Sequence, residues 1–222
     1  QSVQFSTGAG AGDITLTSTV NPQAASTQGL TLVAGTGNIN VTGPVGNLLR
    51  LGALSISSAA NATITNNVTG SSFTQGSGSG TTTFNGNQDY TASFSFTGTD
   101  LVQNGTLNVG TTYTFSGTNS TQNGVVTTGG NYQFTGAALT VNEGMTVGGT
   151  TTINNSGLFT TKNSTGTITS TGAFTQNGTG PNSIGADITT SNTNLSFATG
   201  ITLMQSVQFS TGAGAGDITL TS

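Results

Sequence analysis

The sequence predicts an all-β chain that folds as a single-stranded parallel β-helix (a β-solenoid) of the usual right-handed kind. Three observations lead to this prediction: a 19-residue internal period, alternation of apolar and polar residues, and a composition rich in strand and turn formers. We expect about ten coils of roughly 19–23 residues in each 204-residue repeat, because self-similarity at a fixed period is typical of stacked repeat architectures.

The 19-residue period is clearest in a series of asparagines, whose sequence numbers rise by 19 at every step except one, where they rise by 21: Asn47, Asn66, Asn85, Asn104, Asn123, Asn142, Asn163 and Asn182. Eleven positions after the asparagine comes a column of large apolar residues: Phe96, Phe115, Phe134, Ile153 and Phe174. Identical positions of successive coils lie about 4.8 Å apart in a parallel β-helix. We therefore expect both series to form structural ladders along the axis, as in other cross-β stacks.

Within each row, apolar residues alternate with polar ones, as in 107–109 (Leu-Asn-Val), 113–115 (Tyr-Thr-Phe) and 132–134 (Tyr-Gln-Phe). A period of two places one set of side chains inside and the other outside a strand. About three such strands fit in one row, separated by Gly and Asn, which tolerate the left-handed backbone of tight corners. One row is therefore predicted to be one coil of three short strands.

The composition supports strands and excludes several classes of protein. Charged residues make up 4% of the chain, whereas about 25% is typical of soluble domains. Hydrophobic residues still reach 32%, with 11 Phe and only three Pro, which distinguishes the chain from disordered segments. The two cations, Arg50 and Lys162, are too few to neutralise nucleic-acid phosphates. No apolar run is long enough to suggest membrane insertion, and cysteine is absent.

The first eighteen residues return unchanged as residues 205–222, at an offset of 204. We interpret residues 1–204 as one solenoid repeat and residues 205–222 as the start of the next identical repeat. Both would belong to the same continuous solenoid, without a separate domain. The architectural alternative, two β-sandwich domains in tandem, should leave a change of composition near the middle of the chain, and none is visible.

No catalytic, cofactor-binding or metal-binding residues are predicted. Histidine is absent, and the acids Asp13, Asp89, Asp100, Glu143 and Asp187 do not fall in one column. We therefore expect no enzyme and no cofactor. A remote alternative is a polysaccharide-active β-helix enzyme with a carboxylate pair, which loss of hydrolysis on substitution of Asp89 or Asp100 would indicate.

Two glycine runs are interpreted as corners or bulges. The run Gly8–Gly12, followed by Asp13, lacks both the spacing of a dinucleotide fingerprint and the nine-residue recurrence of a calcium-binding repeat. The run Gly76–Gly80 is interpreted in the same way. Thr-x-Thr triplets such as Thr15–Thr17 fall at different row positions, so ordinary outward threonines explain them better than an ice-binding face.

Low-charge strand repeats rich in Thr, Asn and Gly occupy 37–46 (GNINVTGPVG), 53–70 (ALSISSAANATITNNVTG) and 81–86 (TTTFNG). In these stretches the chain resembles the β-strand-repeat regions of giant bacterial exoproteins and of filamentous-haemagglutinin-like or autotransporter-type adhesins. The resemblance is one of style and composition over nearly the whole chain, with no diagnostic signature. It implies a secreted protein at the cell surface, with a role in adhesion, biofilm matrix or filament building.

Together these observations favour a structural segment of a long extracellular fibre or adhesin stalk, with further copies of the same repeat as partners, end to end and side by side. The alternative is an adhesin module that binds a glycan or a surface. Tyr90, Tyr113 and Tyr132 could stack on sugars if they faced outward, but their alternation with Phe suggests burial. Glycan-array binding would discriminate between the two functions.

Overall fold

A computed structural model of the chain describes residues 1–162 and 166–221. It confirms the predicted fold class, since the chain is an all-β parallel β-solenoid of about nine turns. The described residues include no helix, and so none that could cross a membrane. The right-handed sense of the coil stays a prediction.

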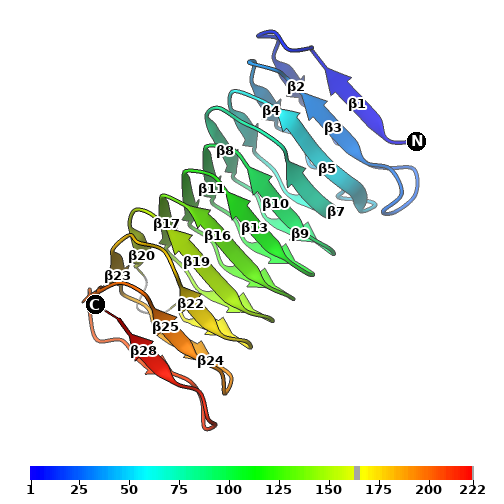
Figure 1. The fold of residues 1–222 in the computed structure, drawn as a ribbon. Coiled ribbons are helices and arrows are strands. Elements are labelled where there is room, and N and C mark those ends of the chain that lie inside the picture. Colours follow the sequence, from blue (N-terminus) through cyan, green and yellow to red (C-terminus); the bar gives the residue numbers. More distant parts are fainter. Residues whose placement is uncertain (163–165, 222) are drawn as a thin grey trace. The chain divides into compact units, whose positions relative to one another are not determined.

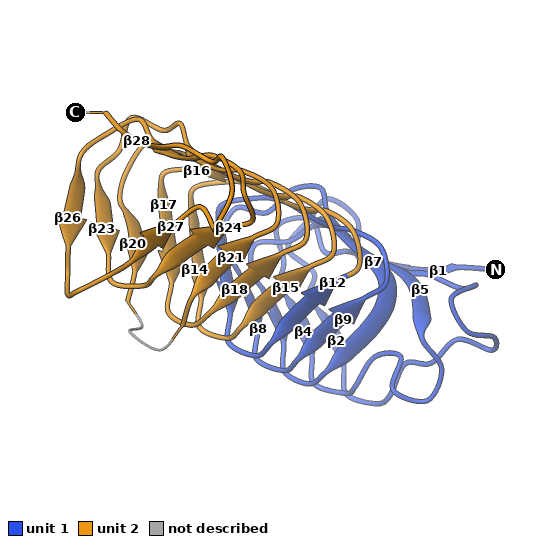
Figure 2. Cartoon of the chain, turned by 90° about the horizontal axis from the view of Figure 1, so that it is seen from below, with its two compact units in different colours: residues 1–109 blue, residues 110–222 orange. Residues whose placement is uncertain are grey.

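The chain divides into two compact units, residues 1–109 and residues 110–222 (Figure 2). In both units the strands follow one another in groups of three, and we call the positions face 1, face 2 and face 3 in chain order. Each strand pairs in parallel with the strand of the same face in the next turn, so that strands such as β13, β16 and β19 lie side by side (Figure 1).

In the first unit, face 1 consists of β2 (Ile14–Leu16), β4 (Ile39–Val41), β6 (Ala62–Ile64), β8 (Thr81–Phe84) and β11 (Asp100–Gln103). Face 2 contains β9 (Gln88–Tyr90) and β12 (Leu107–Val109), and face 3 contains β1 (Val3–Ser6), β3 (Leu30–Val33) and β10 (Phe94–Thr97). Two longer strands, β5 (Leu51–Ser58) and β7 (Val68–Gln75), run around the corner from face 2 to face 3.

In the second unit, face 1 consists of β14 (Asn119–Gln122), β17 (Ala138–Val141), β20 (Phe159–Thr161), β23 (Asn182–Ile184) and β26 (Ile201–Leu203). Face 2 consists of β15 (Val126–Thr128), β18 (Met145–Val147), β21 (Ile168–Ser170), β24 (Ile188–Thr190) and β27 (Phe209–Ser210). Face 3 consists of β13 (Tyr113–Ser116), β16 (Tyr132–Gly136), β19 (Thr151–Asn155), β22 (Phe174–Gln176), β25 (Leu195–Phe197) and β28 (Ile218–Leu220).

Turn length varies more than the sequence period suggests. On face 1 of the first unit, the sequence numbers of paired residues, such as Ile14 and Ile39, differ first by 25 and then by 23, 20 and 19. In the second unit the corresponding steps are 19, 20, 23 and 19. The longer turns explain why about nine turns form where about ten were expected.

The core of each unit is a file of inward side chains from all three faces. The alternation predicted from the sequence is seen directly: Tyr113 and Phe115 are buried, whereas Thr114 between them is only partly buried. The fully buried side chains of the described residues are uncharged, and the polar ones among them are amides and hydroxyls. A core without charge avoids the high desolvation cost of a buried ion.

The sequence-based division into a repeat of residues 1–204 and a second start at residues 205–222 is of another kind than the structural one. It marks identity of sequence, whereas the units at residues 1–109 and 110–222 mark groups of turns with dense internal contacts. The repeat organisation therefore stays a prediction.

Candidate stacking and assembly site

Like side chains stack on like in consecutive turns of the second unit. The rings of Tyr113 and Tyr132 lie with their centroids 4.5 Å apart and 2° from parallel. Those of Phe115 and Phe134 lie 4.9 Å apart and 8° from parallel. Parallel in-register pairing of β13 with β16 imposes this arrangement, because it places each residue directly over its counterpart one 19-residue turn away.

The predicted apolar column is divided by the structure. Phe115, Phe134 and Ile153 lie in register in β13, β16 and β19. Phe174 instead pairs with Thr151, because the turn that follows Ile153 is longer than the series assumes and brings Gln176 over Ile153. Phe96 lies in the first unit, where it pairs with Gln75, while its neighbour Phe94 stacks on Phe73 at 4.7 Å.

The asparagine series behaves in the same way, forming a ladder only across 19-residue turns. Asn104 Nδ2 donates to Asn85 Oδ1 at 2.7 Å, and Asn142 Nδ2 donates to Asn123 Oδ1 at 2.5 Å. These four residues lie at the corner after face 1. Asn85, Asn104 and Asn123 are exposed there and Asn142 is half-buried.

The other four asparagines of the series lie elsewhere. Asn66 falls out of register because the next turn is a 20-residue turn, so that Ile64 pairs with Phe84; its amide donates instead to Thr42 O. Asn47 is exposed in the loop before β5. Asn182 is buried within β23 and pairs with Phe159. Asn163 lies outside the described residues.

A second use of asparagine was not anticipated. The side-chain oxygens of several asparagines accept a hydrogen bond from a backbone N–H of the following turn: Asn61 from Thr81, Asn67 from Asn87, Asn87 from Thr106, and Asn131 from Thr150. The distances are 2.9–3.0 Å. Each bond satisfies a corner amide that no strand ladder reaches, which matters because unpaired backbone donors are costly. The separation of donor and acceptor by one 19- or 20-residue turn was the available signal.

All three tyrosines lie inside the core. Tyr90, Tyr113 and Tyr132 are at most 1% exposed. Burial raises the pKa of Tyr113 to about 12 and raises the pKa values of Tyr90 and Tyr132 well above their usual value. Buried glutamines bind the hydroxyls: Tyr90 OH donates to Gln88 Oε1 at 2.8 Å, and Gln122 Nε2 donates to Tyr132 OH at 2.6 Å. The tyrosine faces are therefore not available to stack on sugars.

The acidic residues are dispersed over separate corners. Asp13 Oδ1 accepts from the Asn38 backbone N–H, and Asp187 Oδ1 accepts from the Gln208 backbone N–H, both at 2.7 Å. Within the described residues no three acidic side chains gather in a group that could hold a metal ion. These two sequence-predicted acids thus act in the structure as local hydrogen-bond acceptors.

Asp89 has a different role, because it forms an ion pair with Arg50. The Arg50 guanidinium also donates through Nη1 to Gly70 O at 2.9 Å and to Asp89 O at 2.8 Å. Since Gly70 and Asp89 belong to the next two turns, one side chain joins three consecutive turns of the first unit. No spacing pattern in the sequence pointed to this contact.

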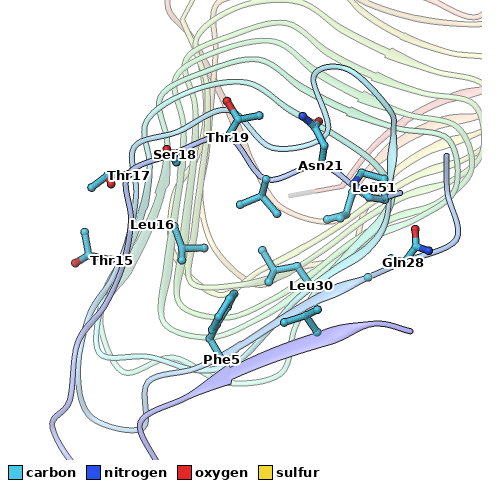
Figure 3. A pocket seen from close by; sticks show the side chains of 14 residues that line it. Phe5, Thr15, Leu16, Thr17, Ser18, Thr19, Asn21, Gln28, Leu30 and Leu51 are labelled. Carbon is cyan, nitrogen blue, oxygen red and sulfur yellow. The ribbon is translucent and has the colours of Figure 1, made fainter. Parts of the chain in front are cut away.

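The first turn of the first unit leaves the interior of the solenoid open. A cavity of about 410 Å³ is lined mainly by apolar side chains, and Phe5, Leu16, Leu30 and Leu51 point into it (Figure 3). Val3 is 50% and Phe5 44% exposed, whereas their partners in the next turn, Leu30 and Leu32, are at most 2% exposed. One further strand on each face would bury this surface.

The last turn of the second unit is uncovered in the same way. Leu203 on face 1 is 56% exposed, and Ile218 and Leu220 on face 3 are 46% and 57% exposed. The partners of Ile218 and Leu220 one turn earlier, Leu195 and Phe197, are fully buried. The described residues therefore present two uncovered turns, each with apolar inward side chains and a row of unpaired backbone groups.

The geometry defines a parallel β-solenoid whose distinctive surfaces are its stacking ladders and its two uncovered turns. No family model matches the chain, and no curated protein or solved structure matches it either. The fold fits a structural or adhesin-like role.

Proposed function

We propose that the chain is a structural segment of a long extracellular fibre or adhesin stalk, built of tandem 204-residue solenoid repeats, in a cell-surface filament, sheath or biofilm matrix. The observation that supports the proposal best is the stacking of like on like. Inner turns are covered on both sides by turns of the same kind, so another solenoid turn is the natural cover for the two uncovered ones.

The distribution of charge supports the same role. In-register stacking places identical positions about 4.8 Å apart, where like charges would repel one another along the whole axis. The chain avoids this cost with six acids and two bases in 222 residues. A nearly neutral side surface also opposes lateral contact between neighbouring fibres only weakly. The proposed partners are therefore further copies of the repeat.

A catalytic role has less support. The acids Asp13 and Asp187 lie at separate corners, and Asp89 is engaged by Arg50. The glycan-binding alternative has lost its aromatic platform, because the three tyrosines are buried. We therefore propose neither function for this segment.

The test is assembly of the purified chain as a function of concentration, followed by electron microscopy and fibre diffraction. We expect thin fibres with an axial reflection near about 4.8 Å. Leu203→Glu should reduce assembly at least tenfold, because it places a charge on an uncovered stacking edge. Leu48→Glu is the matched control, since Leu48 is 79% exposed in a loop away from the stacking edges. Equal assembly of the two variants, or a chain that stays monomeric, would contradict the proposal.

A further inference from the structure

The eighteen residues that occur twice fold in the same way in both places. In each copy a strand leads through a glycine corner into a second strand: β1 and β2 in the first unit, β27 and β28 in the second. Gly8 and its counterpart Gly212 both have positive φ, at 82° and 80°. Such a backbone favours glycine, so the corner is encoded locally.

The same hydrogen bonds also close both corners. Thr7 Oγ1 donates to Gly12 O at 2.6 Å, and Thr211 Oγ1 donates to Gly216 O at 2.9 Å. The backbone N–H of the positive-φ glycine is bound by a serine hydroxyl in each copy, Ser6 at 3.1 Å and Ser210 at 3.2 Å. These contacts lie within the segment and do not depend on the turn beneath it.

The two copies nevertheless occupy different edges of the solenoid. In the first unit, β1 pairs with β3 on face 3 and β2 pairs with β4 on face 1. In the second unit, β27 pairs with β24 on face 2 and β28 pairs with β25 on face 3. The corner thus follows face 3 in the first copy and face 2 in the second.

The neighbouring strands explain why both placements are possible. Ile14 and Leu16 pair with Ile39 and Val41 in the first unit. Their counterparts Ile218 and Leu220 pair with Leu195 and Phe197 in the second unit. Both sites offer two inward apolar side chains at a spacing of two, which is all that a short alternating strand requires.

The change of face follows from the length of the repeat. Counted along the chain, β1 and β25 are both face-3 strands nine turns apart, and β26 and β27 then add two more faces. The 204-residue offset is therefore one face short of ten complete turns.

We propose that this eighteen-residue segment is a corner module that fits more than one edge of the solenoid, and that it joins successive 204-residue repeats with a rotation of one face. Resting on the proposed function in tandem repeats, this predicts that a given side surface points in the same direction only at every third repeat. A stalk built in this way presents each of its side surfaces in three directions.

The test is cysteine cross-linking in the 222-residue chain, which contains no native cysteine. Paired residues of adjacent parallel strands lie within the Cα separation that a disulfide allows. Ser196→Cys with Thr219→Cys reports the observed face-3 placement of the second copy. Thr202→Cys with Thr219→Cys reports the placement on face 1 that the first copy has. Thr15→Cys with Asn40→Cys reports that first copy. Thr15, Thr202 and Thr219 are exposed, so the substitutions should not perturb the core.

We expect the pair at positions 196 and 219 to cross-link at least tenfold more efficiently than the pair at positions 202 and 219, and the pair at positions 15 and 40 to cross-link as well. Efficient cross-linking of positions 202 and 219 would overturn the proposal, because both copies would then use the same face. Failure of both second-copy pairs in chains with wild-type circular dichroism would overturn it too. Since the assay is read on dilute single chains, its result is independent of whether fibres form.

Discussion

Tyr113 and Tyr132 lie one turn apart with their rings 2° from parallel, and both hydroxyls share the amide of Gln122. With Tyr90 equally buried, the chain has no tyrosine at its surface. Phenol ionisation therefore reports directly on opening of the solenoid.

Alkaline titration should give no tyrosinate signal near about pH 10, the usual pKa of tyrosine. Burial raises the pKa of Tyr113 to about 12, so the unfolded state loses this proton first as the pH rises. Stability is therefore complete below about pH 10 and decreases between about pH 10 and 12, by about 3 kcal/mol for this residue. Tyrosinate absorbance in the near ultraviolet should rise together with the loss of circular dichroism. Tyrosinate absorbance that precedes unfolding would contradict the burial, and Tyr113→Phe should weaken the pH dependence.

Phe134→Ala should lower the free energy of unfolding by about 3–5 kcal/mol, because it opens a cavity in a core only one turn thick at each level. It also removes the stack with Phe115. The control is Gln133→Ala, on the exposed side of the same strand, which should change stability by no more than about 0.5 kcal/mol. Urea unfolding monitored by circular dichroism measures both, and similar midpoints would argue against an inward Phe134.

Arg50→Met should lower stability by about 2 kcal/mol, because it leaves the carbonyl oxygens of Gly70 and Asp89 without their donor. Lys162→Met, at the other cation and on an exposed side chain, is the matched control and should be nearly neutral. Asp89→Asn should cost less than about 1 kcal/mol, since the Asp89 side chain is 43% exposed and the carbonyl contacts remain. If Arg50→Met unfolded at the same urea concentration as Lys162→Met, the three-turn contact would be energetically irrelevant.

Gly180→Ala should destabilise the second unit by about 1–3 kcal/mol, because a Cβ at this position would lie 1.9 Å from Gly157 O in the preceding turn. Gly200→Ala is the matched control, since a Cβ there would have no neighbour within 4 Å. It should leave the melting temperature unchanged or raise it slightly. Comparison of the two melting temperatures checks the close approach of consecutive turns, and a stable Gly180→Ala variant would exclude it.

The sequence predicted the features that depend on local alternation and on regular 19-residue turns. The inward positions of Tyr113 and Phe115 follow from alternation, and the bond between Asn85 and Asn104 follows from the period. The period did not predict the lengths of individual corners, because a corner can take up extra residues without changing the strands beside it. Phe174 therefore lies over Thr151, where the series had placed it over Ile153.

Contacts that join different corners were also hidden from the sequence. Arg50 reaches Asp89, 39 residues further along the chain, and nothing in the local pattern of either residue reveals the other. The corner asparagines Asn61 and Asn67 bind backbone groups, so their partners leave no trace in side-chain identity. Such contacts require knowledge of which corners are adjacent, and adjacency depends on all the preceding turn lengths.

The 19-residue turn between Asn123 and Asn142 has an evolutionary consequence. Its two edges carry matching residues at matching positions, so deletion or duplication of this stretch would bring together edges that already fit. A gene encoding such a protein can therefore change the span of its product by whole turns through unequal recombination, with no compensating mutation in the interior.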